Sequence, residues 1–322
     1  MELIKMKKTP ESQNSELLNN EADKSFSFGG CSAEKIEGDN QNFDEDFMGE
    51  HFENLGDVWH AVFGDNDHIV QYFRVIIEQG ELHDDCKFIY PDKTFVALLQ
   101  YPPEPTDIHT GALVVKTPDS DQFEFLTIFP IMEGLPNSFT VKKSHTWENG
   151  VEGVVAAEHI GCGETVSFFA PFYFRDFASF APKAERTMHL AALALSCEKA
   201  ELQEFIVESG GFFEVLLQKF LESNPSKTKE DFSPPVVSML GARILFPSKY
   251  ACRWEYRCPV LRVEQTSYFG RTVYKVHIIF VGRENQELAG YLYIPEHMLR
   301  GYVPQAGDDI EGVLWMTGYL GD

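Results

Sequence analysis

Short apolar segments separated by turn residues are the feature of this sequence that most constrains its fold. Between residues 88 and 174 these segments are rich in Val, Ile, Phe, Tyr and Thr, which strands favour. The separators carry Pro, Gly, Asn and Asp, and residues 147–153 include an Asn-Gly pair typical of a hairpin turn. The pattern predicts strands within 94–101, 111–117, 123–129, 138–147, 151–160 and 164–174.

A second group of apolar segments follows residue 240, and it predicts strands within 242–247, 250–265, 271–282, 287–295 and 309–320. A short helix over 295–301 precedes the last of them. This order resembles an OB-fold, although the OB plan has two strands after its helix and only one remains here. We therefore expect an α+β protein, mostly antiparallel β with a few helices, ending in an OB-like small barrel.

Helices are expected at three places. Apolar residues at helical spacing predict a helix over 69–77, with Asp65–Asp67 as N-cap candidates and Gly80 as the C-cap. A short helix over 58–63 precedes it, and a third helix over 210–223 ends before Pro225. Residues 185–205 are rich in Ala and Leu, and their periodicity fits a helix or a strand.

The chain divides by composition into three parts. Residues 1–45 are polar and acidic and bury too little apolar surface to offset their ordering entropy, so we expect a disordered acidic tail. An acidic α+β domain is expected over 46–224 and the OB-like β domain over 225–322, joined through the polar segment 223–235. Similar Gly-acid turns at 161–169 and 305–313 leave open whether the two β regions are a duplication.

The charge is strongly negative and unevenly distributed. The net charge is −23, and residues 225–322 hold 11 acidic and 11 basic side chains, so the excess lies entirely in the first 224 residues. An acidic surface repels phosphate backbones, which disfavours nucleic-acid binding by the whole chain. It also favours a basic protein partner, which complementary charge would steer towards it.

The remaining composition indicates a cytoplasmic protein. No apolar run is long enough to span a bilayer, and the lysine-containing N-terminus lacks the apolar core of a secretory signal. The six cysteines form no Cys-x-x-Cys pair, so we expect free thiols that pack as small hydrophobic groups. We expect no metal site, cofactor or membrane contact.

The candidate binding residues lie on two of the C-terminal strands. Alternation places Arg253, Glu255 and Arg257 on one face of their strand, opposite Trp254, Tyr256 and Cys258. On the next strand it places Arg271, Lys275 and His277 on the face opposite Tyr274, Val276 and Ile278. A cationic stripe for an anionic ligand or single-stranded nucleic acid would then consist of Arg253, Arg257, Arg271, Lys275 and His277.

Motifs for catalysis are weak. Adjacent Asp308 and Asp309 point to opposite faces of an extended chain, so a turn into a strand explains them better than a shared site. Residues 64–68 fit a helix cap better than a calcium loop, and residues 83–86 fit a solvated turn. A Gly-x-Ser-x-Gly elbow and a phosphate-binding Walker loop are both absent, and we assign no catalytic residue.

The closing segment "GYVPQAGDDIEGVLWMTGYL", with the earlier "VSFFAPFYF" and "MHLAALALSCE", resembles a set of uncharacterised bacterial proteins. Those proteins end on a similar Gly-Asp-Asp-Ile and Leu-Trp segment, and the resemblance covers about residues 90–320. It implies a bacterial origin and carries no activity, cofactor or residue role.

Three functions stay open on this basis. The leading expectation is a non-enzymatic interaction module, of adaptor or immunity type, that presents an acidic surface to a basic partner. The first alternative is an OB-like binder of an anionic ligand or nucleic acid through the cationic stripe. The second is an enzyme whose site lies between the two domains.

Overall fold

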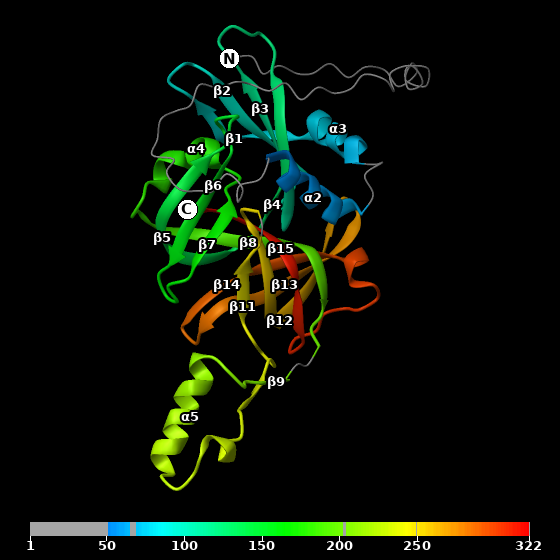
Figure 1. Cartoon of the computed structure of the whole chain (residues 1–322). Coiled ribbons are helices and arrows are strands. Elements are labelled where there is room, and N and C mark those ends of the chain that lie inside the picture. Colours follow the sequence, from blue (N-terminus) through cyan, green and yellow to red (C-terminus); the bar gives the residue numbers. More distant parts are fainter. Residues whose placement is uncertain (1–50, 65–68, 202–203, 249, 322) are drawn as a thin grey trace. The chain divides into compact units, whose positions relative to one another are not determined.

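A computed structural model describes residues 51–64, 69–201, 204–248 and 250–321 (Figure 1). The tail expected over 1–45, the N-cap candidates Asp65–Asp67 and most of the 64–68 motif lie outside these residues. Strands predominate, helices are few, and nearly all strand pairings are antiparallel. The expected mostly antiparallel α+β class is confirmed at this level.

Two helices open the described part of the chain. Helix α2 (His51–Phe63) is longer than the helix expected over 58–63, and α3 (Ile69–Gln79) matches the predicted segment. Val58 and Trp59 of α2 are buried, and the indole of Trp59 donates a hydrogen bond to the carbonyl of Ile128. The amide of Gly80 bonds to the carbonyl of Ile76 at 2.8 Å, so Gly80 ends α3 as predicted.

A four-stranded antiparallel sheet follows, in the order β1-β2-β3-β4. Residues 83–86, expected as a solvated turn, lie inside β1, and this expectation was wrong. Leu82 pairs with Leu99 and Lys87 with Ala97, so four residues of β1 stand opposite one of β2. Such a bulge interrupts the alternation by which a strand is recognised. The strands are β1 (Glu81–Ile89), β2 (Phe95–Tyr101), β3 (Ile108–Lys116) and β4 (Glu124–Met132).

A nine-stranded sheet takes strands from both sides of residue 225, in the order β11-β12-β13-β14-β8-β15-β7-β6-β5. Two further pairings join β12 to β15 and β8 to β5. The division into two domains near residue 225 stays a prediction. The strands are β5 (Leu135–Thr146), β6 (Gly153–His159), β7 (Thr165–Phe169), β8 (Glu185–Lys199), β11 (Ile244–Pro247), β12 (Arg253–Tyr268), β13 (Arg271–Arg283), β14 (Gln286–Pro295) and β15 (Asp309–Leu320).

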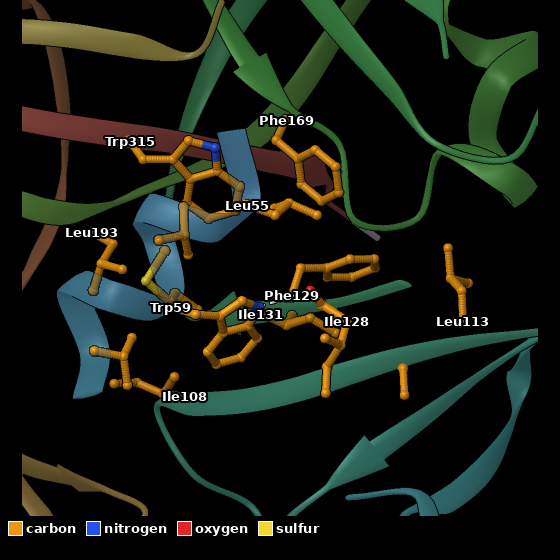
Figure 2. Close-up of a cluster of buried hydrophobic side chains, with 14 of the residues drawn as sticks. Leu55, Trp59, Ile108, Leu113, Ile128, Phe129, Ile131, Phe169, Leu193 and Trp315 are labelled. Carbon is orange, nitrogen blue, oxygen red and sulfur yellow. Dashed lines mark hydrogen bonds between the residues drawn. The ribbon is translucent and has the colours of Figure 1, made fainter. Parts of the chain in front are cut away.

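Strands β8 and β15 lie between two hydrophobic cores. They pair antiparallel from Ile310↔Lys199 to Leu320↔Met188. On one face, Leu193 and Trp315 belong to the core that contains Trp59 (Figure 2). On the other face, Leu190, Ala192, Ala194, Leu314 and Met316 belong to the second core. Residues 185–199 are therefore a strand that is buried on both sides, which explains why the Ala- and Leu-rich segment shows no clear period.

The remaining elements are short. Helix α4 (Tyr173–Asp176) and the 3-10 turn η3 (Phe177–Phe180) follow β7, and η5 (Glu296–Leu299) occupies the short helix expected over 295–301. Between β8 and β11 lies an excursion, residues 200–243. It contains β9 (Glu204–Ile206), α5 (Gly211–Ser223), η4 (Lys229–Asp231) and β10 (Val236–Ser238). None of the helices in the described ranges is long and apolar enough to cross a membrane.

Replacing Trp315 with Ala should destabilise the protein by about 3–5 kcal/mol, because this side chain is almost completely buried between strands that both cores share. Urea unfolding would measure the loss. Leu261→Ala, on an exposed position of β12, is the control and should change stability by no more than about 0.5 kcal/mol. A loss no larger than that of the control would contradict the central position of this strand.

Candidate functional site

The alternation predicted for β12 and β13 is present in the structure. Trp254 and Tyr256 of β12 and Val276 of β13 lie in the second core, and Arg253 and Lys275 alternate with them. The basic side chains are nevertheless covered by other segments. Arg253, Arg257 and Lys275 are all buried.

Lys275 is at the centre of an ion cluster with two carboxylates from the first half of the chain. Its ammonium nitrogen lies 2.7 Å from Asp107 and 2.5 Å from Glu133, and only 6% of its side chain is exposed. The hydroxyl of Tyr293 donates to the carbonyl of Glu133 at 2.9 Å. The ring of Tyr291 lies 4.3 Å from the ammonium nitrogen. The cluster joins β13 and β14 to the residues that precede β3 and β5.

Opposing effects set the pKa values in this cluster. Burial raises the pKa of Asp107, but hydrogen bonds from Lys275 and neighbouring side chains outweigh it and hold the pKa below its usual range. Burial lowers the pKa of Lys275, and its bonds to Asp107 and Glu133 outweigh that effect and raise the pKa. Asp107 and Lys275 are therefore both charged at neutral pH.

Arg253 and Arg271 bind the first helix. Arg253 forms a 2.7 Å ion pair with Asp57 of α2, and its guanidinium lies over the ring of Tyr250. Arg271 donates to the carbonyl of Phe63, the last residue of α2, at 3.0 Å. Together with Lys275, these residues hold acidic and carbonyl groups of the first half against β12 and β13.

Arg257 and His277 complete the predicted set. Arg257 forms a 2.9 Å ion pair with Glu311 and donates to the carbonyl of Glu201 at 2.7 Å. The His277 ring lies against Tyr291. Burial is the largest effect on its pKa and lowers it. The five residues thus lie on neighbouring strands and contact protein groups, and their role as ligand-binding residues stays a prediction.

Asp308 and Asp309 bind different partners. Asp308 forms an ion pair with Lys199 and accepts a hydrogen bond from Tyr302. Asp309 accepts one from the amide of Gly241 at 2.7 Å. Nothing in the geometry makes the two carboxylates a common site. Among the described residues, no cluster of three or more His, Cys, Asp or Glu side chains is arranged to hold a metal ion.

Arg257 and Asp309 also fix the two ends of the excursion. Arg257 binds the backbone at residue 201, where the excursion begins, and Asp309 binds it at residue 241, near its end. The backbone amide of Ala200 adds a bond to the carbonyl of Asp309 at 2.8 Å. Both anchoring side chains are buried, so the backbone is held at residue 201 and at residue 241, close to the two ends of the excursion.

Within the excursion, a two-stranded sheet exposes apolar side chains. Ile206 of β9 pairs directly with Val236 of β10, and these residues are 61% and 59% exposed. Leu240, which follows β10, and Phe246 of β11 are also strongly exposed. The excursion has a separate small aromatic cluster in which Phe213 and Phe220 pack on Phe232. The exposed pair is therefore not needed to complete that cluster.

One acidic side chain lies beside the apolar pair in the sheet, and three more glutamates are close to β9 in the sequence. Glu204 stands opposite Ser238 in the sheet, and both are exposed on the same side as Ile206 and Val236. Glu198, Glu201 and Glu208 lie on either side of β9 in the sequence, and the only basic residue among residues 198–208 is Lys199. That lysine is already paired with Asp308. We call Glu204, Ile206, Val236 and Ser238 the β9–β10 face.

A small cleft of about 200 Å³ lies between the end of β2 and the β12–β13 hairpin. Its residues supply aromatic rings, hydroxyl groups and proline, and they include no carboxylate, imidazole, amine or thiol. This lining offers apolar and aromatic contact together with hydroxyl groups for hydrogen bonding. The residues are Tyr101, Pro102, Thr106, Ile108, Ser267, Tyr268, Phe269 and Gly270.

No family model, curated protein or solved structure matches the chain. The β9–β10 face is not found by sequence reasoning, because β9 lies in a segment of ambiguous periodicity and β10 follows a polar linker. The acidic composition around residues 198–208 was the available signal.

Lys275→Met should destabilise the protein by about 2 kcal/mol at pH 7, because it leaves two carboxylates without their cation, although both are partly solvated. Urea unfolding would measure this loss. Lys142→Met is the matched control, since Lys142 pairs with Glu158 on the exposed surface and should contribute less than about 1 kcal/mol.

The stability that Lys275→Met loses should become smaller as the pH falls. The folded-state pKa of Asp107 is lowered, so its stabilising contribution is present above the unfolded-state pKa of about 3.9 and disappears as the pH falls through the folded-state value. The difference between the parent and Lys275→Met should therefore shrink below about pH 4. A difference that is constant from pH 7 to pH 3 would contradict the electrostatic role of the cluster.

Proposed function

We propose that the protein is a non-enzymatic interaction module that binds a basic protein partner through the β9–β10 face. The observation that carries the proposal is the pair Ile206 and Val236, which are opposite each other on a two-stranded sheet and mostly exposed. A two-stranded sheet is marginally stable without a further packing surface. An exposed apolar pair on such a sheet therefore gains most from a partner that covers it.

The charge around this face supports a basic partner. Four glutamates lie between residues 198 and 208, and the only lysine among them is already paired. The net charge of −23 adds a long-range attraction for a basic protein and opposes association with a second acidic copy. The partner's apolar side chains would cover Ile206 and Val236, and its Lys or Arg residues would pair with the glutamates.

The alternative of an anionic ligand at the cationic stripe is less well supported. Such a ligand would have to replace Asp57, Asp107, Glu133 and Glu311 as partners of the basic side chains. Removing one partner from a buried ion pair is costly in free energy.

The expected location of the protein, the bacterial cytoplasm, is a proposal that rests on the sequence.

We also infer that the OB-like part is a small barrel. Strands β12, β13, β14, β8 and β15 each pair with the next, and β15 pairs again with β12. A ring of five strands is the strand number of an OB-fold, but β8 comes from the first half of the chain. This barrel would place the excursion between two of its own strands.

The double substitution Ile206→Ser and Val236→Ser should weaken partner binding by roughly 10- to 100-fold, because it removes the apolar centre of the proposed interface. Affinity capture from a bacterial lysate followed by mass spectrometry would identify the partner, and titration of that purified partner would measure the loss. Leu261→Ser with Val303→Ser is the control, because these residues are also exposed but lie outside the excursion.

The partner should be basic, retained by the parent and the control, and lost from the double variant and at high salt. Equal capture by the parent and the double variant would contradict the proposal. Capture that depends on Arg253 or Arg257 and is unaffected by the double variant would instead favour the cationic stripe.

A further inference from the structure

The turn between β6 and β7 places a cysteine against a histidine. The Nδ1 atom of His159 lies 3.1 Å from the sulfur of Cys162. The backbone amide of Cys162 also donates to Nδ1 at 3.1 Å. Because Nδ1 accepts this hydrogen bond, it carries no proton, and the neutral imidazole has its proton on Nε2. The one lone pair of Nδ1 is shared between the backbone amide and the thiol of Cys162.

The turn is built around this contact. The amide of His159 bonds to the carbonyl of Glu164, and the amide of Gly163 bonds to the carbonyl of His159 at 2.8 Å. A Cβ atom on Gly161 would lie only 2.9 Å from Cε1 of His159, so glycine at this position lets the ring lie over the turn. Phe139 packs edge-on against the same ring. His159 is therefore fixed in place by packing as well as by the chain.

Cys162 differs from the other cysteines in the described residues. Cys86, Cys197, Cys252 and Cys258 are buried, whereas Cys162 is partly exposed and can be reached by a small molecule. None of the five forms a disulfide. A second described thiol that could condense with an oxidised Cys162 would have to leave a core first.

Burial is the largest effect on the pKa of Cys162 and raises it, and the electrostatic effect of Glu164 raises it further, while the backbone amides of Glu164 and of Cys162 itself lower it. Burial also lowers the pKa of His159, so the imidazole is neutral at pH 7. The sulfur thus keeps its proton at neutral pH, and its reaction depends on a base that contacts it. His159 supplies such a base, and the backbone amide of Glu164 can stabilise negative charge that develops on sulfur.

We propose that Cys162 is a base-assisted thiol that small hydroperoxides oxidise to the sulfenic acid. The sulfur attacks one peroxide oxygen, an S–O bond forms and the O–O bond breaks. The thiol proton passes to Nδ1 of His159 and then to the departing oxygen, which leaves as water when the oxidant is hydrogen peroxide. Sulfur is oxidised by two electrons and the peroxide is reduced by two. The site is independent of the proposed β9–β10 interface.

The test follows the rate at which hydrogen peroxide makes Cys162 reactive to dimedone, a trap for sulfenic acids, with the modified peptide quantified by mass spectrometry. The 322-residue chain with Cys31→Ser serves as the parent, because Cys31 lies outside the described residues. His159→Phe should slow the reaction about a hundredfold, at the lower end of what a positioned base contributes. His109→Phe is the control and should leave the rate unchanged, since His109 is a half-buried ring on β3 whose Nδ1 bonds to the carbonyl of Pro102.

Two further measurements remain decisive if His159→Phe is unstable. Gly161→Ala keeps the imidazole but displaces it, and it should also slow trapping. In the parent, trapping at Cys162 should be faster in the native protein than in the urea-unfolded chain, where the base no longer contacts the sulfur. A native rate equal to or below the unfolded rate would overturn the proposal, and so would an unchanged rate in both variants.

Discussion

The antiparallel pair β8–β15 is the interaction on which the rest of the structure depends. Each strand has apolar side chains on both faces, and each face belongs to a different core. Burial of both faces removes water from the backbone hydrogen bonds of the pair as well as from its side chains. Because β12 and β7 also pair with β15, and β14 and β5 with β8, nearly the whole nine-stranded sheet is built outwards from these two strands.

Charge then determines how the two halves of the chain meet. Residues 225–322 are neutral overall, yet Arg253 and Lys275 are paired with Asp57, Asp107 and Glu133 from the first half. These pairs neutralise part of the acidic excess inside the protein. The glutamates that remain exposed, including those beside β9, therefore carry the charge that a partner would encounter.

Much of the fold could be predicted from local patterns, because strands with one buried face alternate visibly and helices repeat their apolar residues at helical spacing. Strand β5, in which buried and exposed residues alternate, and helix α5 are examples. What the sequence could not show was long-range pairing: β8 looks equally like a helix because both of its faces are apolar, and residues 83–86 look like a turn because they bulge. The alternation of Arg253 and Lys275 was also readable, but the carboxylates that cover them lie 142 to 196 residues away in the chain, so the stripe looked exposed.

The β9–β10 face could not be found from the sequence either, because the exposure of Ile206 and Val236 depends on which distant segments the fold places beside them. That the fold leaves Ile206 and Val236 exposed is also the reason to propose this face as a binding surface. Ile206 and Val236 lie on a short sheet whose base is held by buried Arg257 and Asp309, and so the sheet is presented on a fixed support. Because the ends of the excursion are already held, binding would order fewer residues, and so cost less conformational entropy, than the ordering of a free segment. An apolar pair that belongs to neither described core, beside the exposed Glu204, is the surface that the proposed recognition of a basic protein would use.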